Sequence, residues 1–294
     1  MGPGARCGIR EVFPSCVWVA KARGMTIKLA IAGAAGRMGR ELARIVLETN
    51  GCSLMGGLEA PGSPHVGRDY GELIGVGKNG VIISDEPAVL LSTCDGIIDF
   101  TSAPATLTLV KLTAAHKKFH VIGTTGIGVE GDAIIKVASA QTVIMKTGNY
   151  SLGINLLASL VKKAAAALGE EFDIEILEMH HRNKVDAPSG TAYLLGKASA
   201  DGRAISLTDK SVRSRDGITG ARRAGDIGFA TLRGGSVVGD HTVIFAGSGE
   251  RLEFRHVAEN RELFARGAVK AAMWAAGKKP GLYTMNDVLG LDPR

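Results

Sequence analysis

A glycine-rich turn near the start of the chain separates an apolar run from an amphipathic one. Residues 27–32 are mostly apolar, as in a buried strand, and Gly33, Gly36 and Gly39 follow at once. Residues 40–48 then place apolar side chains at helical spacing. Glycines let such a turn stay tight and let its backbone approach a pyrophosphate, whose charge the N-terminus of the next helix stabilises. The pattern predicts a strand–turn–helix unit that binds a dinucleotide.

The alternation of strands and helices continues through the first half of the chain. Apolar runs and helical spacing predict strands at residues 53–58, 96–100, 119–122 and 142–145, and helices at 104–116 and 132–140. Strands that alternate with helices favour a parallel, doubly wound sheet of the Rossmann type. We therefore assign residues 25–150 to a dinucleotide-binding α/β domain.

The pattern changes after Asn149. A long helix is predicted at residues 152–167, and alternating segments predict strands at 173–180, 228–233, 236–246 and 251–258. Gly247 to Gly249 is a hairpin signal between the last two strands. We expect residues 151–260 to form an α+β domain with a mainly antiparallel open sheet. A final helix at 262–276 and the tail, residues 261–294, are expected to return and complete the first domain.

An acidic residue ends the second predicted strand and bears on the choice of nucleotide. Glu59 can accept hydrogen bonds from an adenosine ribose, which favours NAD. The next residue, Ala60, offers no charge to a 2′-phosphate, although Arg37 in the glycine turn offers some. We expect use of NADH and NADPH with a preference for NADH. Loops at residues 100–102, 123–125 and 147–150 should line the same edge of the sheet.

The segment from Glu178 to Ala192 concentrates chemistry-bearing side chains between a predicted strand and a predicted helix. His180 and His181 can exchange protons near neutral pH, and Lys184 supplies positive charge. The N–H groups of residues 189–191 would open the helix, where carboxylates bind well. These groups can converge on a small anionic ligand. Adjacent histidines on a polar loop can also be merely solvated.

A metal site is disfavoured in that segment. None of the four cysteines lies near it, and adjacent histidines lack the spacing that places two ligands on one helix face. The sequence therefore predicts no metal. The cysteines show no disulfide or zinc pattern, which fits a reducing compartment such as the cytoplasm.

Charge and hydropathy exclude two classes of partner. The chain of 294 residues has a net charge of +6, but no basic face studded with aromatic residues, so nucleic-acid binding is not indicated. No apolar run approaches the roughly 20 residues that cross a bilayer. Residues 1–24 carry four basic residues and one acidic residue, with no periodic pattern and no intact signal-peptide core. We expect them to be an extension outside the fold.

Several motifs together resemble a known family. The chain is similar to the 4-hydroxy-tetrahydrodipicolinate reductases, or dihydrodipicolinate reductases, of bacterial lysine and diaminopimelate synthesis. The resemblance covers about residues 26–291, and its most specific part is the His-His-Arg-Asn-Lys-Val-Asp-Ala-Pro-Ser-Gly-Thr run. The other matching segments are residues 32–39, 123–126, 149–153, 238–241 and 255–256.

The resemblance implies a reaction and a role for each matching residue. Family members reduce a cyclic imine with NADH or NADPH after its 4-hydroxyl has left as water. His180 would deliver a proton beside the carbon that receives hydride, and Lys184 would be a second proton donor and an anchor. His181 and residues 189–191 would hold the carboxylates of the substrate. The implied substrate-binding residues are His181, Lys184, Ser189, Gly190 and Thr191, and the implied cofactor-binding residues are Gly33, Ala34, Ala35, Gly36, Arg37, Met38, Glu59, Gly123, Thr124, Thr125, Thr147, Gly148, Asn149 and Tyr150.

The resemblance also implies assembly, and one position departs from the family. Members are usually homotetramers that assemble through the sheet of the second domain. Many that take NADPH have an arginine where this chain has Ala60. Two other hypotheses stay open from the residues alone. A different two-domain nicotinamide enzyme would not need the segment from Glu178 to Ala192, and a non-enzymatic dinucleotide sensor would not need His180.

Overall fold

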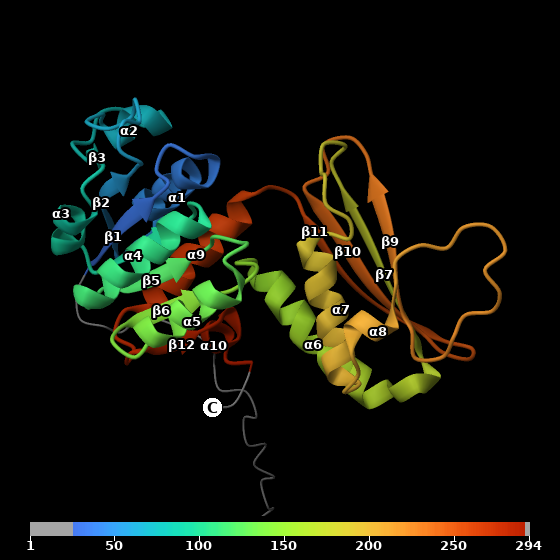
Figure 1. The fold of residues 1–294 in the computed structure, drawn as a ribbon. Helices are drawn as coiled ribbons and strands as arrows, with labels where there is room; N and C mark the ends of the chain where they lie inside the picture. The colour runs from blue at the N-terminus through green and yellow to red at the C-terminus, as the bar shows by residue number, and fades with distance from the viewer. Residues whose placement is uncertain (1–25, 292–294) are drawn as a thin grey trace, which may run out of the picture.

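The chain folds into two lobes that lie side by side (Figure 1). The structure is a computed structural model that describes residues 26–291; the predicted extension, residues 1–24, lies outside the described residues. The first lobe holds a seven-stranded sheet and the second a five-stranded sheet. The helix α6 leaves the first lobe and runs beneath the sheet of the second (Figure 1).

The first sheet is parallel throughout. Its order is β12-β6-β5-β4-β1-β2-β3, so the chain reverses direction across the sheet between β1 and β4. The strands are β1 (Ile27–Ala32), β2 (Cys52–Leu58), β3 (Ile83–Ser84), β4 (Gly96–Asp99), β5 (Phe119–Ile122), β6 (Val143–Lys146) and β12 (Gly281–Tyr283). The predicted Rossmann-type sheet is confirmed, and its reversal point is where open α/β sheets bind ligands.

Helices cover both faces of this sheet. Apolar side chains of α1 and α9 pack on one face, and those of α3, α4 and α5 pack on the other. The helices are α1 (Arg37–Glu48), α2 (Tyr70–Ile74), α3 (Pro87–Thr93), α4 (Ala103–Ala115), α5 (Gly128–Ala138), α9 (Glu262–Ala275) and α10 (Met285–Leu289). The C-terminal segment returns to this lobe, because β12 pairs with β6 and α9 packs beside α1.

The second sheet is mixed. Its order is β11-β10-β7-β9-β8. The strands are β7 (Asp173–His180), β8 (Ser211–Val212), β9 (Ile227–Arg233), β10 (Gly239–Ala246) and β11 (Arg251–Ala258), and the accompanying helices are α6 (Leu152–Leu168), η1 (Gly169–Glu171), α7 (Gly190–Gly202) and α8 (Leu207–Lys210). Apolar residues of α6 and α7 form the core against one face of the sheet.

The prediction of a mainly antiparallel second sheet needs one correction. β10 runs antiparallel to β7 and β11, as expected, but β9 runs parallel to both β7 and β8. The physical reason is the connection. The chain passes from β7 to β9 through α7 and a long loop, which bring it back to the end of the sheet where β7 begins, so β9 runs in the same direction as β7. A tight turn joins β10 to β11, so these two strands run in opposite directions.

Two arginines of the exposed loop before β9 are paired with carboxylates of β7. Arg222 donates hydrogen bonds to Asp173 (2.7 Å), Glu175 (3.0 Å) and the carbonyl of Asp226 (2.7 Å). Arg215 forms a two-pronged ion pair with Glu175 at 2.8 and 2.9 Å. These arginines tie the loop to β7, because planar guanidinium groups match carboxylates in pairs.

One helical stretch also differs from the sequence expectation. Among residues 26–291, Leu152–Glu171 is long and apolar enough, by length and composition, to cross a membrane. Lys162 and Lys163 interrupt the apolar residues of this stretch, so the sequence shows no continuous apolar run there. Ile154, Leu157 and Val161 are buried in the second core, as expected for a helix that packs on a sheet.

The glycine Gly267 sets how closely α9 approaches the point where the chain leaves the first lobe. A Cβ there would lie 1.8 Å from the carbonyl oxygen of Tyr150. Alanine normally favours a helix interior over glycine by about 1 kcal/mol. Here overpacking against backbone should outweigh that gain, with a cost of about 1–3 kcal/mol or more.

We therefore expect Gly267→Ala to lower the free energy of unfolding measured by urea denaturation. Gly148→Ala is the matched control, because a Cβ at Gly148 meets no atom within 4 Å. An unchanged or higher stability for Gly267→Ala would show that α9 can move away from Tyr150 without loss.

Candidate active site

The glycine turn leaves the start of α1 open. Gly33 has φ of +77°, a conformation that glycine adopts without strain, and the N–H groups of Gly33 and Ala34 donate to the carbonyl of Leu58. α1 then begins with no side-chain cap and no acidic residue in its first turn. Its first N–H groups and its dipole therefore suit a pyrophosphate, as predicted from the spacing of the glycines.

Glu59 is held at the same turn. Its Oε1 accepts a hydrogen bond from the N–H of Ala35 at 2.7 Å. This bond positions the carboxylate beside the turn and leaves Oε2 for a ribose hydroxyl. Ala60 and Arg37 are both exposed, and Arg40, which follows the turn in α1, donates from Nε to the carbonyl of Ala35 at 2.9 Å.

Two adjoining cavities continue from the turn along the carboxyl edge of the sheet. They measure 250 and 260 Å³ and share Met38, Phe100 and Gly123. The structure thus brings the three predicted loops together. The predicted cofactor residues that line them are Gly36, Arg37, Met38, Gly123, Thr124, Thr125, Thr147, Gly148, Asn149 and Tyr150. Phe264 of α9 also lines this space, and no local signal in the sequence indicated it.

Several of the predicted residues have side chains or N–H groups that are already engaged, as Gly33 and Ala35 do within the turn. Tyr150 is buried, and its hydroxyl donates to the carbonyl of Ile122 at 2.8 Å. Burial raises the pKa of this phenol well above its ordinary value. Ala34 uses its N–H within the turn, as described above. Tyr150 therefore lines the cavity without offering it a free polar group, and Ala34 is buried in the turn.

A buried pair of titratable residues lies on β4 and β5, next to the loops that follow these two strands. Asp99 and His120 are fully buried, with Oδ2 and Nε2 3.1 Å apart. Burial opposes ionisation of Asp99, but His120 and the hydrogen bonds of Thr101 outweigh it and lower its pKa. Thr101 in turn donates to Thr124, so the loops after β4 and β5 are joined.

A second cluster lies at the end of β7 in the other lobe. His180 Nδ1 lies 2.5 Å from Glu178 Oε2, and Arg233 of β9 contacts both oxygens of Glu178 at 2.9 and 3.0 Å. Burial opposes ionisation of Glu178, but Arg233 and His180 outweigh it and lower its pKa. Burial lowers the pKa of His180, and Glu178 opposes that effect.

The N-terminus of α7 lies beside this cluster. Ser189 caps the helix, because its hydroxyl accepts from the N–H of Ala192 at 3.1 Å; its own N–H donates to Glu178. His241 Nε2 lies 3.2 Å from the same hydroxyl, and burial lowers the pKa of His241 to about 4. Ser189 is therefore occupied within the protein. The N–H groups of Gly190 and Thr191 have no hydrogen-bond acceptor among the described residues.

Lys184 and His181 lie on the loop between β7 and α7. Lys184 Nζ lies 2.7 Å from Asp186 Oδ1, and Arg261 Nη2 lies 3.3 Å from His181 Nε2. Asn149, from a predicted cofactor loop, donates to the hydroxyl of Thr191 at 3.0 Å. This last bond joins the two lobes directly between the two predicted sites.

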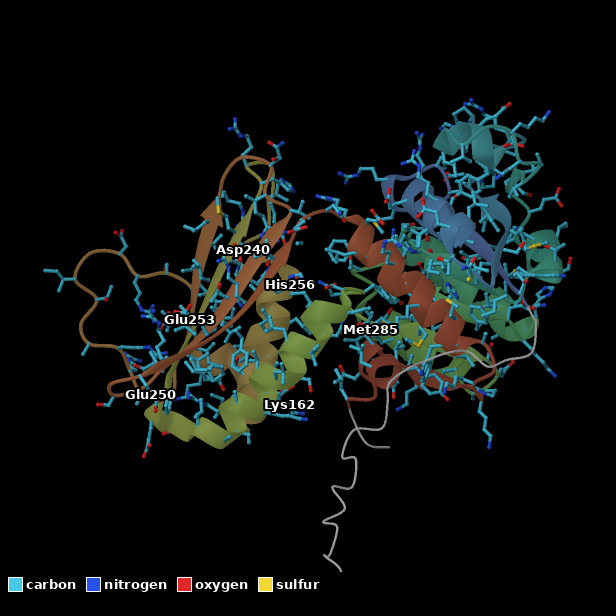
Figure 2. All side chains as sticks on the ribbon, turned by 180° about the vertical axis from the view of Figure 1, so that it is seen from behind. Lys162, Asp240, Glu250, Glu253, His256 and Met285 are labelled. Atoms are coloured by element: carbon cyan, nitrogen blue, oxygen red, sulfur yellow. The ribbon has the colours of Figure 1, made fainter. Side chains whose placement is uncertain are left out.

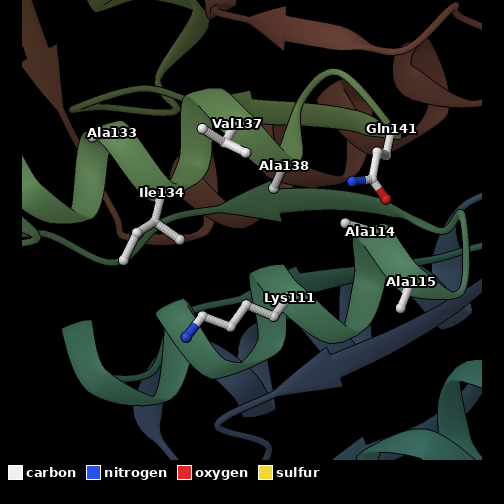
Figure 3. Close-up of a pocket in the computed structure, with 8 residues that line it drawn as sticks. All are labelled: Lys111, Ala114, Ala115, Ala133, Ile134, Val137, Ala138 and Gln141. Carbon is white, nitrogen blue, oxygen red and sulfur yellow. The ribbon is translucent and has the colours of Figure 1, made fainter.

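A separate groove lies away from these groups. It occupies 460 Å³ between α4, which contributes Lys111 and Ala114, and α5, which contributes Ile134 and Val137 (Figure 3). It holds one charged side chain and no pair of groups for proton transfer, so it does not belong to the site. Across residues 26–291, no cluster of three or more His, Cys, Asp or Glu could hold a metal ion.

Comparison with known proteins shows where this arrangement belongs. Residues 27–150 match the family model described as dihydrodipicolinate reductase, N-terminus, and residues 153–289 match that described as dihydrodipicolinate reductase, C-terminus. The chain belongs to the dihydrodipicolinate reductase family.

Individual relatives agree with this family. The 4-hydroxy-tetrahydrodipicolinate reductase of Afipia carboxidovorans is 59% identical over 90% of this chain and 97% of its own length. That of Brucella abortus is 58% identical over 90% of this chain and 99% of its own length. The structure of dipicolinate-bound dihydrodipicolinate reductase from Paenisporosarcina sp. TG-14 has a TM-score of 0.71 and 25% identity, and covers 88% of this chain and 98% of that one.

The family gives the activity. The protein is an oxidoreductase that reduces 4-hydroxy-tetrahydrodipicolinate with NADH or NADPH, in lysine and diaminopimelate biosynthesis. When bound, the nicotinamide nucleotide supplies the hydride. The uncapped start of α1, the carboxylate of Glu59 and the two adjoining cavities fit such a nucleotide.

The sequence predicted no role for three residues of the second cluster, Glu178, Arg233 and His241. Glu178 stood at the start of the segment from Glu178 to Ala192, two residues before the His-His run. Arg233 comes from a strand that was expected to be antiparallel but runs parallel to β7, and His241 lay in a matching segment without an assigned task. Strand alternation could have indicated Glu178, because it lies two residues before His180 and therefore on the same face.

The geometry at Glu59 leads to a prediction about cofactor choice. A 2′-phosphate beside Glu59 would meet like charge, and Ala60 supplies no counter-charge, so NADH should serve at least as well as NADPH. Ala60→Arg should shift the ratio of the two specificity constants toward NADPH by roughly tenfold, since a charge-assisted contact contributes about 1–3 kcal/mol. The measurement is kcat/KM for each cofactor at low and high salt. A strong NADPH preference in the unaltered protein would contradict the argument and point to Arg37.

Proposed function

We propose that His180 is the proton donor of the reduction and that Lys184 anchors the substrate and stabilises developing charge. The observation that carries this proposal is the orientation of His180. Its Nδ1 faces Glu178, so Nε2 is the nitrogen left for a substrate. A histidine held in this way can protonate the ring carbon next to the one that receives hydride.

The proposed carboxylate-binding groups surround this donor. Gly190 and Thr191 contribute N–H groups at the start of α7, and His181 and Lys184 contribute side chains from the preceding loop. A helix N-terminus and a lysine both favour a carboxylate. A relative is described as binding dipicolinate, a planar ring with two carboxylates, which this set of donors suits.

The reaction balances with one donor and one cofactor. The substrate loses its 4-hydroxyl together with one hydrogen of an adjacent ring carbon as water; a hydride then adds to one ring carbon, and a proton from His180 adds to its neighbour. Tetrahydrodipicolinate, the oxidised nucleotide and water result, and His180 recovers its proton from solvent. Cationic Lys184 lowers the free energy of the negative charge that develops before protonation.

His180→Gln tests the proton donor. Turnover should fall roughly 10²-fold or more, as for the loss of a positioned general acid. The dissociation constant for NADH should change little, because His180 lies in the other lobe from the glycine turn. His116→Gln is the control, since His116 is exposed at the end of α4. Turnover of His180→Gln within about threefold of the unaltered protein would sink the assignment.

We also propose that residues 26–150 with 261–291 bind the nucleotide, and that residues 151–260 bind the substrate and form a homotetramer. The face of the second sheet opposite α6 and α7 supports this. Leu177 and Met179 alternate with the buried residues of β7, and Leu232 and Val257 continue the same face with half of their surface exposed. Exposed apolar patches of this kind mark interfaces.

The assembly can be measured by analytical ultracentrifugation. The unaltered protein should sediment at four times the 30.6 kDa mass of the chain. Leu232→Glu should yield smaller species, because it buries a charge without a partner. Val129→Glu, at an exposed valine of α5 in the other lobe, should remain a tetramer. Equal masses for both variants would place the interface elsewhere.

A cytoplasmic location without a membrane or nucleic-acid partner completes the proposal. Ile154, Leu157 and Val161 of α6 are buried in the core of the second lobe, and Leu156 and Leu160 are exposed. Cys52 and Cys94 are free thiols, which fits a reducing compartment. The basic residues Arg215 and Arg222 are paired with carboxylates rather than presented as a patch.

A further inference from the structure

Glu178 is a buried carboxylate at the centre of the second cluster. Its side chain is 1% exposed, yet its oxygens contact four other residues: His180, Arg233, Ser189 and Thr231. A buried charge is tolerated only when such donors replace water. The lowered pKa of Glu178, for which Arg233 and His180 outweigh burial, agrees with an ionised side chain.

Strand geometry places these groups together. Residues two apart on a strand share a face, so Glu178 and His180 both point to the buried side of β7. β9 runs parallel to β7 in a register that puts Arg233 opposite His180. The guanidinium reaches back to both oxygens of Glu178, and it also donates to the carbonyl of Asp186 at 2.7 Å.

We propose that Glu178 is a positioning residue of the reductase and that Arg233 holds the carboxylate of Glu178 in place. Glu178 holds His180 with Nδ1–H toward its own carboxylate and Nε2 toward the substrate. The inference rests on the proposed role of His180 as proton donor. Glu178 does not touch the reacting atoms; it acts through the imidazole.

The same carboxylate also orients the proposed carboxylate-binding site. Its Oε1 accepts the N–H of Ser189, the capping residue of α7, at 3.1 Å. The free N–H groups of Gly190 and Thr191 follow directly. One side chain therefore contacts both the proposed proton donor, His180, and Ser189, which precedes the groups proposed to hold the substrate.

The charged and titratable groups around His180 make its protonation depend on Glu178. Burial lowers the pKa of His180, and Lys184 of the loop and Arg233 of β9 lower it further; Glu178 of β7 opposes them. The ring of His241 on β10 lies 5.0 Å away, edge-on, and its own pKa of about 4 leaves it neutral. Glu178 is thus the one group in this set that favours the imidazolium, the form that can donate a proton.

Glu178→Gln tests the proposal while keeping size and most hydrogen bonds. The amide would donate to Nδ1, so neutral His180 would carry its proton on Nε2 and would be a poor acid. We expect kcat at neutral pH to fall about tenfold or more. Activity that depends on a protonated donor is lost as pH rises through the pKa of that donor. The alkaline limb of the kcat profile should therefore move to lower pH, while the dissociation constant for NADH should not change.

Glu175→Gln is the matched control. Glu175 lies on the same strand and pairs with two arginines, Arg215 and Arg222, but contacts no histidine. It should keep the pH profile of the unaltered protein. Melting temperature and sedimentation are measured for both variants, so that a loss of folding or assembly is separated from a loss of proton donation.

A second measurement needs no change at Glu178. Nitrogen-15 NMR of histidine-labelled protein, with the His180 signals identified by their loss in His180→Gln, reports which ring nitrogen carries the proton. We expect neutral His180 to be protonated on Nδ1. Protonation on Nε2, or an unchanged kcat profile for folded Glu178→Gln, would overturn the inference. If His180→Gln itself stays active, the proposed function fails instead, and the two failures are distinguishable.

Discussion

Parallel pairing is the constraint on which the arrangement of the first lobe depends. β1 pairs in parallel with both β2 and β4, so no tight hairpin can join these strands, and each connection must cross the sheet through a helix. The loops that precede those helices all emerge at one edge. The glycine turn, Glu59 and the loops after β4, β5 and β6 are therefore neighbours in space although they span more than a hundred residues of sequence. Met285, near the end of the chain, belongs to the core of this lobe, whereas Asp240 and His256 lie on the second sheet (Figure 2).

The second lobe uses strand pairing for a different purpose. β7 alternates strictly between buried and partly exposed residues, and its buried set changes from Ile174 and Ile176 to Glu178 and His180 toward the carboxyl end. Apolar residues supply the core at one end of the strand, and polar residues supply a site at the other. Burying Glu178 would be unfavourable alone, and the guanidinium of Arg233 offsets that desolvation.

The sequence was most informative where periodicity and turn chemistry agreed. The bounds of β1, β5, β7 and β11 match their predictions, because each combines clear alternation or an apolar run with strong turn residues. The short elements α2, β3, β12 and α10 were missed, since two to five residues carry no periodic signal. The contact of Arg233 with Glu178 could not be predicted either, because it requires the parallel register of β7 and β9, which is set by a distant crossover. The ion pairs of Arg222 could not be predicted for a similar reason, because its carboxylate partners lie about fifty residues earlier.

The ion pair between Lys184 and Asp186 bears on how a dianionic substrate is recognised. Lys184 Nζ already lies 2.7 Å from Asp186 Oδ1. In the proposed role of Lys184 as substrate anchor, an arriving carboxylate would exchange with Asp186 rather than neutralise a bare cation. The net gain from that exchange is small, because one ion pair replaces another. In the proposed site, selectivity for two carboxylates over one would then depend on the N–H groups at the start of α7, whose direction is fixed by the backbone. A ligand with a single carboxylate would satisfy either Lys184 or these N–H groups but not both, so the proposed site would discriminate by the number of carboxylates and not by net charge alone.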